Sequence, residues 1–149
     1  MTQAVASPKP RRSAPVARFR MRVMSGESIA IGPGKIELLE SIRDTRSITA
    51  AAKAMGMSYR RAWMLVDEVN RSLKKPAVAS AIGGDRGGGS ELTAVGELLV
   101  RTYRKIESDA KAACAKDIAT LTGLIESPGR SSAAPLAPGG QRRRSRSTP

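Results

Sequence analysis

Two adjacent arginines, Arg60 and Arg61, are the residues of this sequence best placed to do specific chemistry. A guanidinium group presents its N–H donors in a planar fork, which fits the O6 and N7 acceptors of guanine or the oxygens of a phosphate. The two residues before them, Ser58 and Tyr59, carry hydroxyl groups that can reach phosphate oxygens. The chemistry that this stretch predicts is recognition of a phosphate-rich anion.

Catalysis and metal binding have little support in the sequence. There is no histidine, which removes the commonest general base and the commonest metal ligand. Asp67 and Glu68 are predicted to point outward from a helix, with no partner suited to general acid–base work. Cys114, the single cysteine, has no partner for an internal disulfide and is predicted to be a small buried apolar residue in a reducing cytoplasm. We therefore expect a cytoplasmic non-enzyme without a cofactor or metal.

The charge of the chain favours a polyanionic partner. It contains 26 lysines and arginines against 13 aspartates and glutamates, a formal net charge of +13. Such a charge is typical of proteins that bind nucleic acid or an anionic membrane surface. The alternative interpretation is that the charge of the tails only aids solubility. No apolar run approaches 18 residues, and the N-terminus lacks the apolar region of a signal peptide. We expect no membrane association.

Composition divides the chain into one domain and two tails. Residues 1–15 and 128–149 are basic and rich in proline, serine and alanine, and they are predicted to be disordered because they offer too little apolar surface to bury. Residues 16–127 contain 18 basic and 13 acidic residues, so the predicted domain is itself basic.

The arginine pair is predicted to begin the second of two short helices. In the stretch "SITAAAKAMGMSYRRAWMLVDEVN", residues 47–70, Ser47 and Ser58 are placed as N-caps and Gly56 as a left-handed helix end. At 100° per residue, one arc of the second helix is apolar and predicted to be buried. It contains Tyr59, Ala62, Trp63, Leu65, Val66, Val69 and Leu73. Arg60, Arg61 and Met64 fall on the outward arc, which begins with the two arginines.

Further elements are predicted on both sides of this pair. Phe19, Met21 and Val23 alternate with arginines, and "ESIAI" returns with Ile29 and Ile31 on one face, which predicts an N-terminal β-hairpin. A helix opens at Pro33, with Ile36, Leu39 and Ile42 on one side. "PAVASAI", "GGDRGGGS" and "ELT" are typical of a strand, a glycine-rich tip and a return strand. A long helix then begins after Thr93 as N-cap.

This order of elements is that of a winged helix-turn-helix, a mainly α fold with small β elements. An ordinary helical hairpin with solvated arginines is the alternative. In the winged fold, Arg86 at the glycine-rich tip would contact the minor groove or its phosphates. A phosphate-binding nucleotide loop fits this tip poorly because the Gly-Lys-Ser/Thr ending is absent, whereas a simple mobile turn stays open.

The last predicted helix is longer than a small domain can cover. Its apolar stripe runs from Leu99 to Ile125 through Tyr103, Ile106, Ala110, Cys114, Ile118 and Leu121. A helix of roughly 30 residues is about 45 Å long. Part of the stripe therefore needs a second chain, and we predict a homodimer joined through this helix.

Three stretches together resemble a known family. "GPGKIELLESIRDTRSITAAAKAMGMSYRRAWMLVDEVN", "GGDRGGGS" and "LTAVGELLV" are similar, in this order, to the N-terminal DNA-binding domain of ModE-type molybdate-responsive regulators, over roughly residues 17–107. The resemblance implies a winged helix of the LysR-like class, homodimerisation outside the helix-turn-helix, and the second helix in the DNA major groove. Residues 58–61 match the start of that helix, and Arg86 lies in the wing.

The sequence departs from that family after the long helix. Full-length members carry C-terminal oxyanion-binding domains, whereas "SPGRSSAAPLAPGGQRRRSRSTP" is too short and too polar to form one. An oxyanion site needs convergent backbone N–H groups or basic side chains on a rigid scaffold. We expect a stand-alone DNA-binding domain without molybdate-binding domains and without a small-molecule effector site within this chain.

Taken together, these patterns predict a homodimeric, sequence-specific transcription regulator that binds double-stranded DNA and is associated with the bacterial nucleoid. The alternative is a nonspecific architectural protein that coats phosphates. The residues predicted to contact DNA are Ser47, Thr49, Ser58, Tyr59, Arg60, Arg61, Met64 and Arg86.

Overall fold

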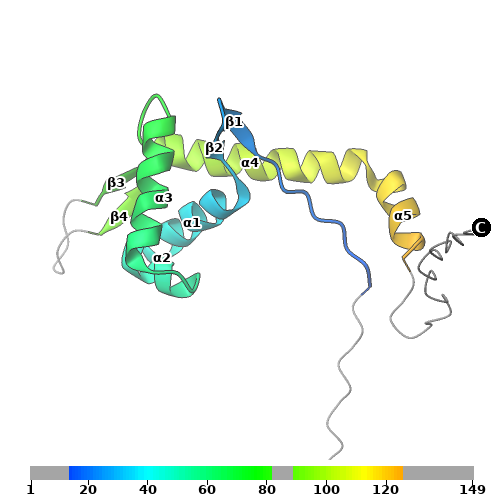
Figure 1. The fold of residues 1–149 in the computed structure, drawn as a ribbon, viewed down its shortest axis with the longest axis horizontal. Helices are drawn as coiled ribbons and strands as arrows, with labels where there is room; N and C mark the ends of the chain where they lie inside the picture. The colour runs from blue at the N-terminus through cyan, green and yellow to red at the C-terminus, as the bar shows by residue number, and fades with distance from the viewer. Residues whose placement is uncertain (1–13, 82–88, 126–149) are drawn as a thin grey trace, which may run out of the picture.

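The computed structural model describes residues 14–81 and 89–125. Within these ranges the elements are β1 (Val23–Ser25), β2 (Ser28–Ile31), α1 (Pro33–Thr45), α2 (Ile48–Ala54), α3 (Tyr59–Ser72), β3 (Val78–Ser80), β4 (Ser90–Leu92), α4 (Ala94–Ala113) and α5 (Ala115–Gly123). Helices α1, α2 and α3 and the β3–β4 pair gather at the N-terminal end of α4, and α4 continues well beyond them (Figure 1). This is the mainly helical winged helix-turn-helix that the sequence predicts.

Helix α1 lies at the centre of the core. It packs against α2, α3, α4 and β4, so its buried surface is wider than one stripe. Ile36, Leu39 and Ile42 are buried as predicted, and Leu38 is buried as well. Pro33 starts the helix, where its missing N–H leaves no helical hydrogen bond unmade. A central helix with one wide buried arc is what holds the other elements in place.

The N-terminal hairpin forms, but only Met21 and Ile31 of its predicted apolar face pack against the core. Strand pairing is confined to β1 and β2, and its register shifts between Val23 and Met24. Such an irregularity breaks the simple alternation on which the predicted faces depend. Val23 and Ile29 are exposed, the small Ala30 is the buried residue of β2, and Phe19, which lies before the paired strands, is exposed as well.

Helices α4 and α5 replace the single long helix that the sequence predicts. Helix α4 ends at Ala113, Cys114 adopts φ −97° and ψ 13°, and α5 begins at the next residue. Figure 1 shows α5 turning away from the axis of α4. Cys114 is only half-buried, so its predicted burial is wrong too. The break lies where no core packs against the helix, and neither proline nor glycine marks it in the sequence.

An ion-pair cluster fixes α4 on α1. The Arg104 guanidinium donates to both carboxylate oxygens of Glu40, at 2.8 and 2.7 Å, and to Glu107 at 2.7 Å. These hydrogen bonds from Arg104 hold the pKa of Glu40 below its ordinary value. The neighbouring Tyr103 is buried, and its hydroxyl donates to the Met21 carbonyl at 2.8 Å. The segment before β1 and the middle of α4 are thereby joined to the core.

Candidate nucleic-acid interface

The turn between α2 and α3 is built from the caps that the sequence predicts. The Ser47 hydroxyl accepts a hydrogen bond from the Ala50 N–H at 3.1 Å, and the Ser58 hydroxyl accepts one from the Arg61 N–H at 3.2 Å. Gly56 has φ +64°, a left-handed conformation that glycine adopts without steric cost. Both N-caps and the left-handed glycine are therefore confirmed. Ser47 starts α2, Gly56 ends it, and Ser58 starts α3 two residues later.

Small side chains let α3 cross α2 closely. Ala51 and Ala52 of α2 and Ala62 of α3 are at most 2% exposed. Val66 and Val69 continue the buried side of α3 toward its C-terminal end. The core therefore packs against the side of α3 that carries Ala62, Val66 and Val69, and the residues before Ala62 lie outside the core.

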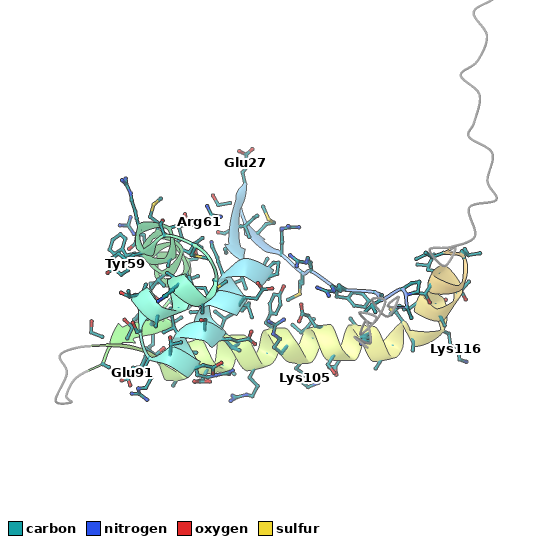
Figure 2. All side chains as sticks on the ribbon, turned by 90° about the horizontal axis from the view of Figure 1, so that it is seen from below. Glu27, Tyr59, Arg61, Glu91, Lys105 and Lys116 are labelled. Atoms are coloured by element: carbon teal, nitrogen blue, oxygen red, sulfur yellow. The ribbon has the colours of Figure 1, made fainter. Side chains whose placement is uncertain are left out.

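The first half of α3 presents a large exposed surface. Arg60 and Arg61 are exposed, and Met64 is 48% exposed. Tyr59 and Trp63 are 54% and 50% exposed, although both fall on the arc predicted to be buried. Figure 2 shows Tyr59 and Arg61 projecting from α3 away from α4. This part of α3 thus combines guanidinium groups with apolar and aromatic surface.

The burial predicted for Tyr59 and Trp63 is wrong for a tertiary reason. A helical wheel assigns the whole apolar arc to the core, whereas the core covers only the part of it that carries Ala62, Val66 and Val69. Tyr59 and Trp63 lie at the edge of the arc and stay about half exposed. Sequence reasoning therefore takes Trp63 for a core residue and misses it as a surface residue. Its position four residues after Tyr59 places the two aromatic rings on the same side of the helix.

Helix α2 contributes hydroxyl groups. Thr49 is exposed in the first turn of α2, and Ser47 is half-buried because its side chain caps that helix. A serine hydroxyl that accepts a capping hydrogen bond still has its own proton to donate. Ser47 and Ser58 can therefore cap their helices and donate to an acceptor at the same time.

The base of the wing is fixed to the end of α1. Strands β3 and β4 are antiparallel, with Val78 opposite Leu92 and Ser80 opposite Ser90. The Ser90 N–H donates to the Arg46 carbonyl at 3.0 Å, and the Arg46 guanidinium lies 2.7 Å from Glu91. Arg86, the predicted wing contact, lies outside the described residues.

Asn70 joins α3 to the wing. Its side-chain oxygen accepts from the N–H groups of Ala77 and Val78, at 2.8 and 3.1 Å, and its amide donates to the Val78 carbonyl at 3.0 Å. These bonds replace strand pairing on that side of β3 and set the position of the wing relative to α3. Nothing in the sequence distinguishes Asn70 from a solvated helix residue, so it is not among the predicted site residues.

Other kinds of site find no support in the residues that the structure describes. Across 14–81 and 89–125, no group of three or more histidine, cysteine, aspartate or glutamate residues is arranged to hold a metal ion. The helices of these two ranges also include none whose length and apolar character would let it cross a membrane. The exposed half of α3 is the feature that any functional proposal has to explain.

Comparison with known proteins finds relatives over about half of the chain. The molybdenum-pterin-binding protein MopB of Rhodobacter capsulatus is 41% identical over 86 residues, covering 58% of this chain and 32% of that protein. The molybdenum transport protein ModE of Azotobacter vinelandii is 36% identical over 94 residues, covering 63% and 35%. The transcriptional dual regulator ModE of Escherichia coli K12 is 39% identical over 71 residues, covering 48% and 27%.

These matches confirm the resemblance to ModE-type regulators over the aligned residues. The chain spans about a third of the length of the relatives it matches. Their names describe regulators and molybdenum proteins, not enzymes. No protein-family model matches the chain. Among solved structures, a chain of the CbnR DNA-binding domain in complex with DNA aligns with a TM-score of 0.46 at 19% identity, over 59% of this chain and 95% of that one.

Proposed function

We propose that this protein is a homodimeric transcription regulator that binds specific sequences in double-stranded DNA, with the first half of α3 in the major groove. The observation that carries the proposal is the exposure of Arg60 and Arg61 at the capped start of a helix that stands out from the core. The similarity to DNA-binding ModE regulators supports it. A DNA partner also favours a cytoplasmic, nucleoid-associated location.

The dimensions and chemistry of α3 suit the major groove. An α-helix with side chains is about 10–12 Å across, and the groove is about 12 Å wide. Arg60 and Arg61 can fork onto guanine edges, and Tyr59, Trp63 and Met64 can contact thymine methyl groups. The hydroxyl groups of α2 and of Ser58 can donate to phosphates, which fixes the register on the duplex. The wing, with Arg86, would contact the backbone or the minor groove.

Nonspecific architectural binding is the second candidate, and the basic character of the domain favours it. The two candidates differ in specificity. We expect selection from a random DNA pool to enrich one sequence, and isotherms at a fixed salt concentration to show a preference of roughly 10³-fold or more over random duplex. A ratio near one would support the architectural protein and contradict sequence-specific regulation.

The homodimer proposal is supported by the apolar side chains of the last two helices. Beyond Tyr103 the stripe leaves the core, and Ile106, Leu121 and Ile125 are 43%, 65% and 55% exposed. Each apolar side chain of this size gains about 1.5–3 kcal/mol when it is fully buried. A second copy packed along α4 and α5 would supply that burial and place two α3 helices on one duplex.

Charged residues on this stripe should separate the dimer. We expect the variant Ile106→Glu/Leu121→Glu to have a monomer mass by light scattering at micromolar concentration, where the wild type has a dimer mass. Its affinity for the selected DNA should fall at least about tenfold, because a monomer engages one half-site only. Both residues are exposed, so the core should be preserved, which circular dichroism can check.

The matched control is Ala112→Glu/Ala119→Glu. These exposed alanines lie seven residues apart and outside the stripe, and the control adds the same two charges. We expect it to remain a dimer. A wild type that is monomeric both free and on DNA would contradict the homodimer.

A further inference from the structure

An open cleft lies between the β1–β2 hairpin, the start of α1 and one side of α3. Its volume is about 860 Å³. Five cationic side chains line it: Arg20, Arg22, Lys35, Arg61 and Arg71. Two carboxylates, those of Glu27 and Glu68, also line it. The cleft is therefore basic, and it shares Arg61 with the exposed surface of α3.

Two of these cations are already neutralised within the protein. Lys35 Nζ lies 3.3 Å from a carboxylate oxygen of Glu68, and Arg71 Nε lies 2.9 Å from Asp67. Within the described residues, Arg20, Arg22 and Arg61 have no carboxylate oxygen within 4.0 Å of their guanidinium groups. Three guanidinium groups without a carboxylate partner leave the cleft with positive charge that an anion can neutralise.

Lys35 also fixes the hairpin relative to α3. Its side chain is about nine-tenths buried, and its ammonium donates to the Ile29 carbonyl at 2.6 Å and to the Ala30 carbonyl at 3.4 Å. Together with the Glu68 pair, these bonds connect β2, α1 and α3. Figure 2 shows Glu27, at the tip of the hairpin, projecting to the same side of the molecule as Arg61. The hairpin therefore stands beside α3 in a fixed position.

We propose that this cleft binds the phosphate backbone of the DNA strand that borders the major groove occupied by α3. This inference rests on the proposed function and adds Arg20 and Arg22, which lie outside the helix-turn-helix, to the contacts. A helix in the major groove has a row of phosphates on each side, so an element held beside that helix meets one row. The contacts are sequence-independent, because phosphates carry no base identity.

The test compares two charge-removing double variants. Arg20→Gln/Arg22→Gln removes the hairpin-side arginines, and Lys105→Gln/Lys116→Gln removes two exposed lysines of α4 and α5. Figure 2 shows Lys105 on the side of α4 away from Arg61. Affinity is measured against salt concentration on selected DNA and on random duplex. We expect the salt slope of the arginine variant to fall by about 0.9 for each phosphate that the variant no longer neutralises, and its affinity to fall by the same factor on both DNAs.

Two more variants test whether charge is what matters, and unfolding midpoints separate this effect from folding defects. Arg20→Lys/Arg22→Lys keeps the charge and should restore most of the slope, and the unfolding midpoint of each variant shows whether the fold is kept. Glu27→Gln removes a carboxylate from the cleft and should raise affinity on both DNAs.

Equal salt slopes for Arg20→Gln/Arg22→Gln and the lysine control would overturn the proposal. Thermal protection by inorganic phosphate in the wild type but not in the arginine variant, with unchanged DNA slopes, would identify a small-anion site and overturn it as well. A wild type without sequence preference would contradict the proposed function instead. The salt slopes on random duplex would still test the cleft, because they do not depend on sequence preference.

Discussion

Replacing Arg60 or Arg61 with alanine is expected to weaken binding to the selected DNA by about 1–3 kcal/mol for each residue that contacts a base edge. That weakening corresponds to about 5- to 150-fold in Kd. Both arginines are exposed at the start of α3, and Arg61 uses only its backbone N–H in the cap with Ser58. Their guanidinium groups are therefore available without any cost to the fold.

The effect should be specific in a way that isotherms can measure. An arginine that reads guanine should relax the preference at one base pair, whereas one that contacts only phosphate should weaken binding to all sequences alike. Arg101→Ala, which removes an exposed arginine from α4, is the matched control and should leave the sequence preference unchanged. Isotherms on selected and scrambled DNA that do not change in either α3 variant would contradict the assignment of α3 as the recognition helix.

Replacing Gly96 with alanine is expected to lower the free energy of unfolding by about 2–3 kcal/mol, as overpacking in a close contact does. A Cβ atom at Gly96 would lie 2.2 Å from the Ala77 carbonyl oxygen and 3.1 Å from its carbon. These are backbone atoms of the segment that leads into β3, and they are held by hydrogen bonds from Thr93 and by Asn70. Neither α4 nor this segment can move aside without breaking such bonds.

Gly34→Ala is the control for the Gly96 variant. Gly34 is also helical, but a Cβ atom there would have no heavy atom within 4 Å. Alanine at an open helical position is expected to be neutral or to stabilise by up to about 1 kcal/mol. Denaturant unfolding of both variants measures the difference. If the two variants had equal stability, the close approach of α4 to the wing would not be the constraint that we infer.

The sequence by itself determines the local features of the interface. Ser47, Ser58 and Thr93 act as N-caps because each cap depends on hydrogen bonds within three residues of the chain. Gly56 adopts the left-handed conformation for an equally local reason, its missing Cβ. The buried stripe of α1 and the outward position of the two arginines follow from helical periodicity.

Only the tertiary structure decides how much of the apolar face of a helix is buried. Tyr59 and Trp63 have the periodicity of core residues, yet the core covers only the part of that arc with Ala62, Val66 and Val69 and leaves both aromatic residues exposed. In the same way, the stripe of the last helix continues to Ile125 in sequence, while the core ends near Tyr103 and the helix breaks at Cys114. Periodicity reports which side of a helix is apolar, and the reach of neighbouring elements sets how much of that side is covered.

The residues that position the site were decided at the tertiary level as well. Lys35 and Asn70 are ordinary polar residues in the sequence, and each becomes a junction because the fold brings carbonyl and N–H groups of other elements to its side chain. Arg20 and Arg22 appear in the sequence as the polar face of a strand, and the fold places them beside α3. Hydrogen bonds and charge clusters between distant segments depend on distances that chain order does not encode, which is why they emerge only when the elements pack.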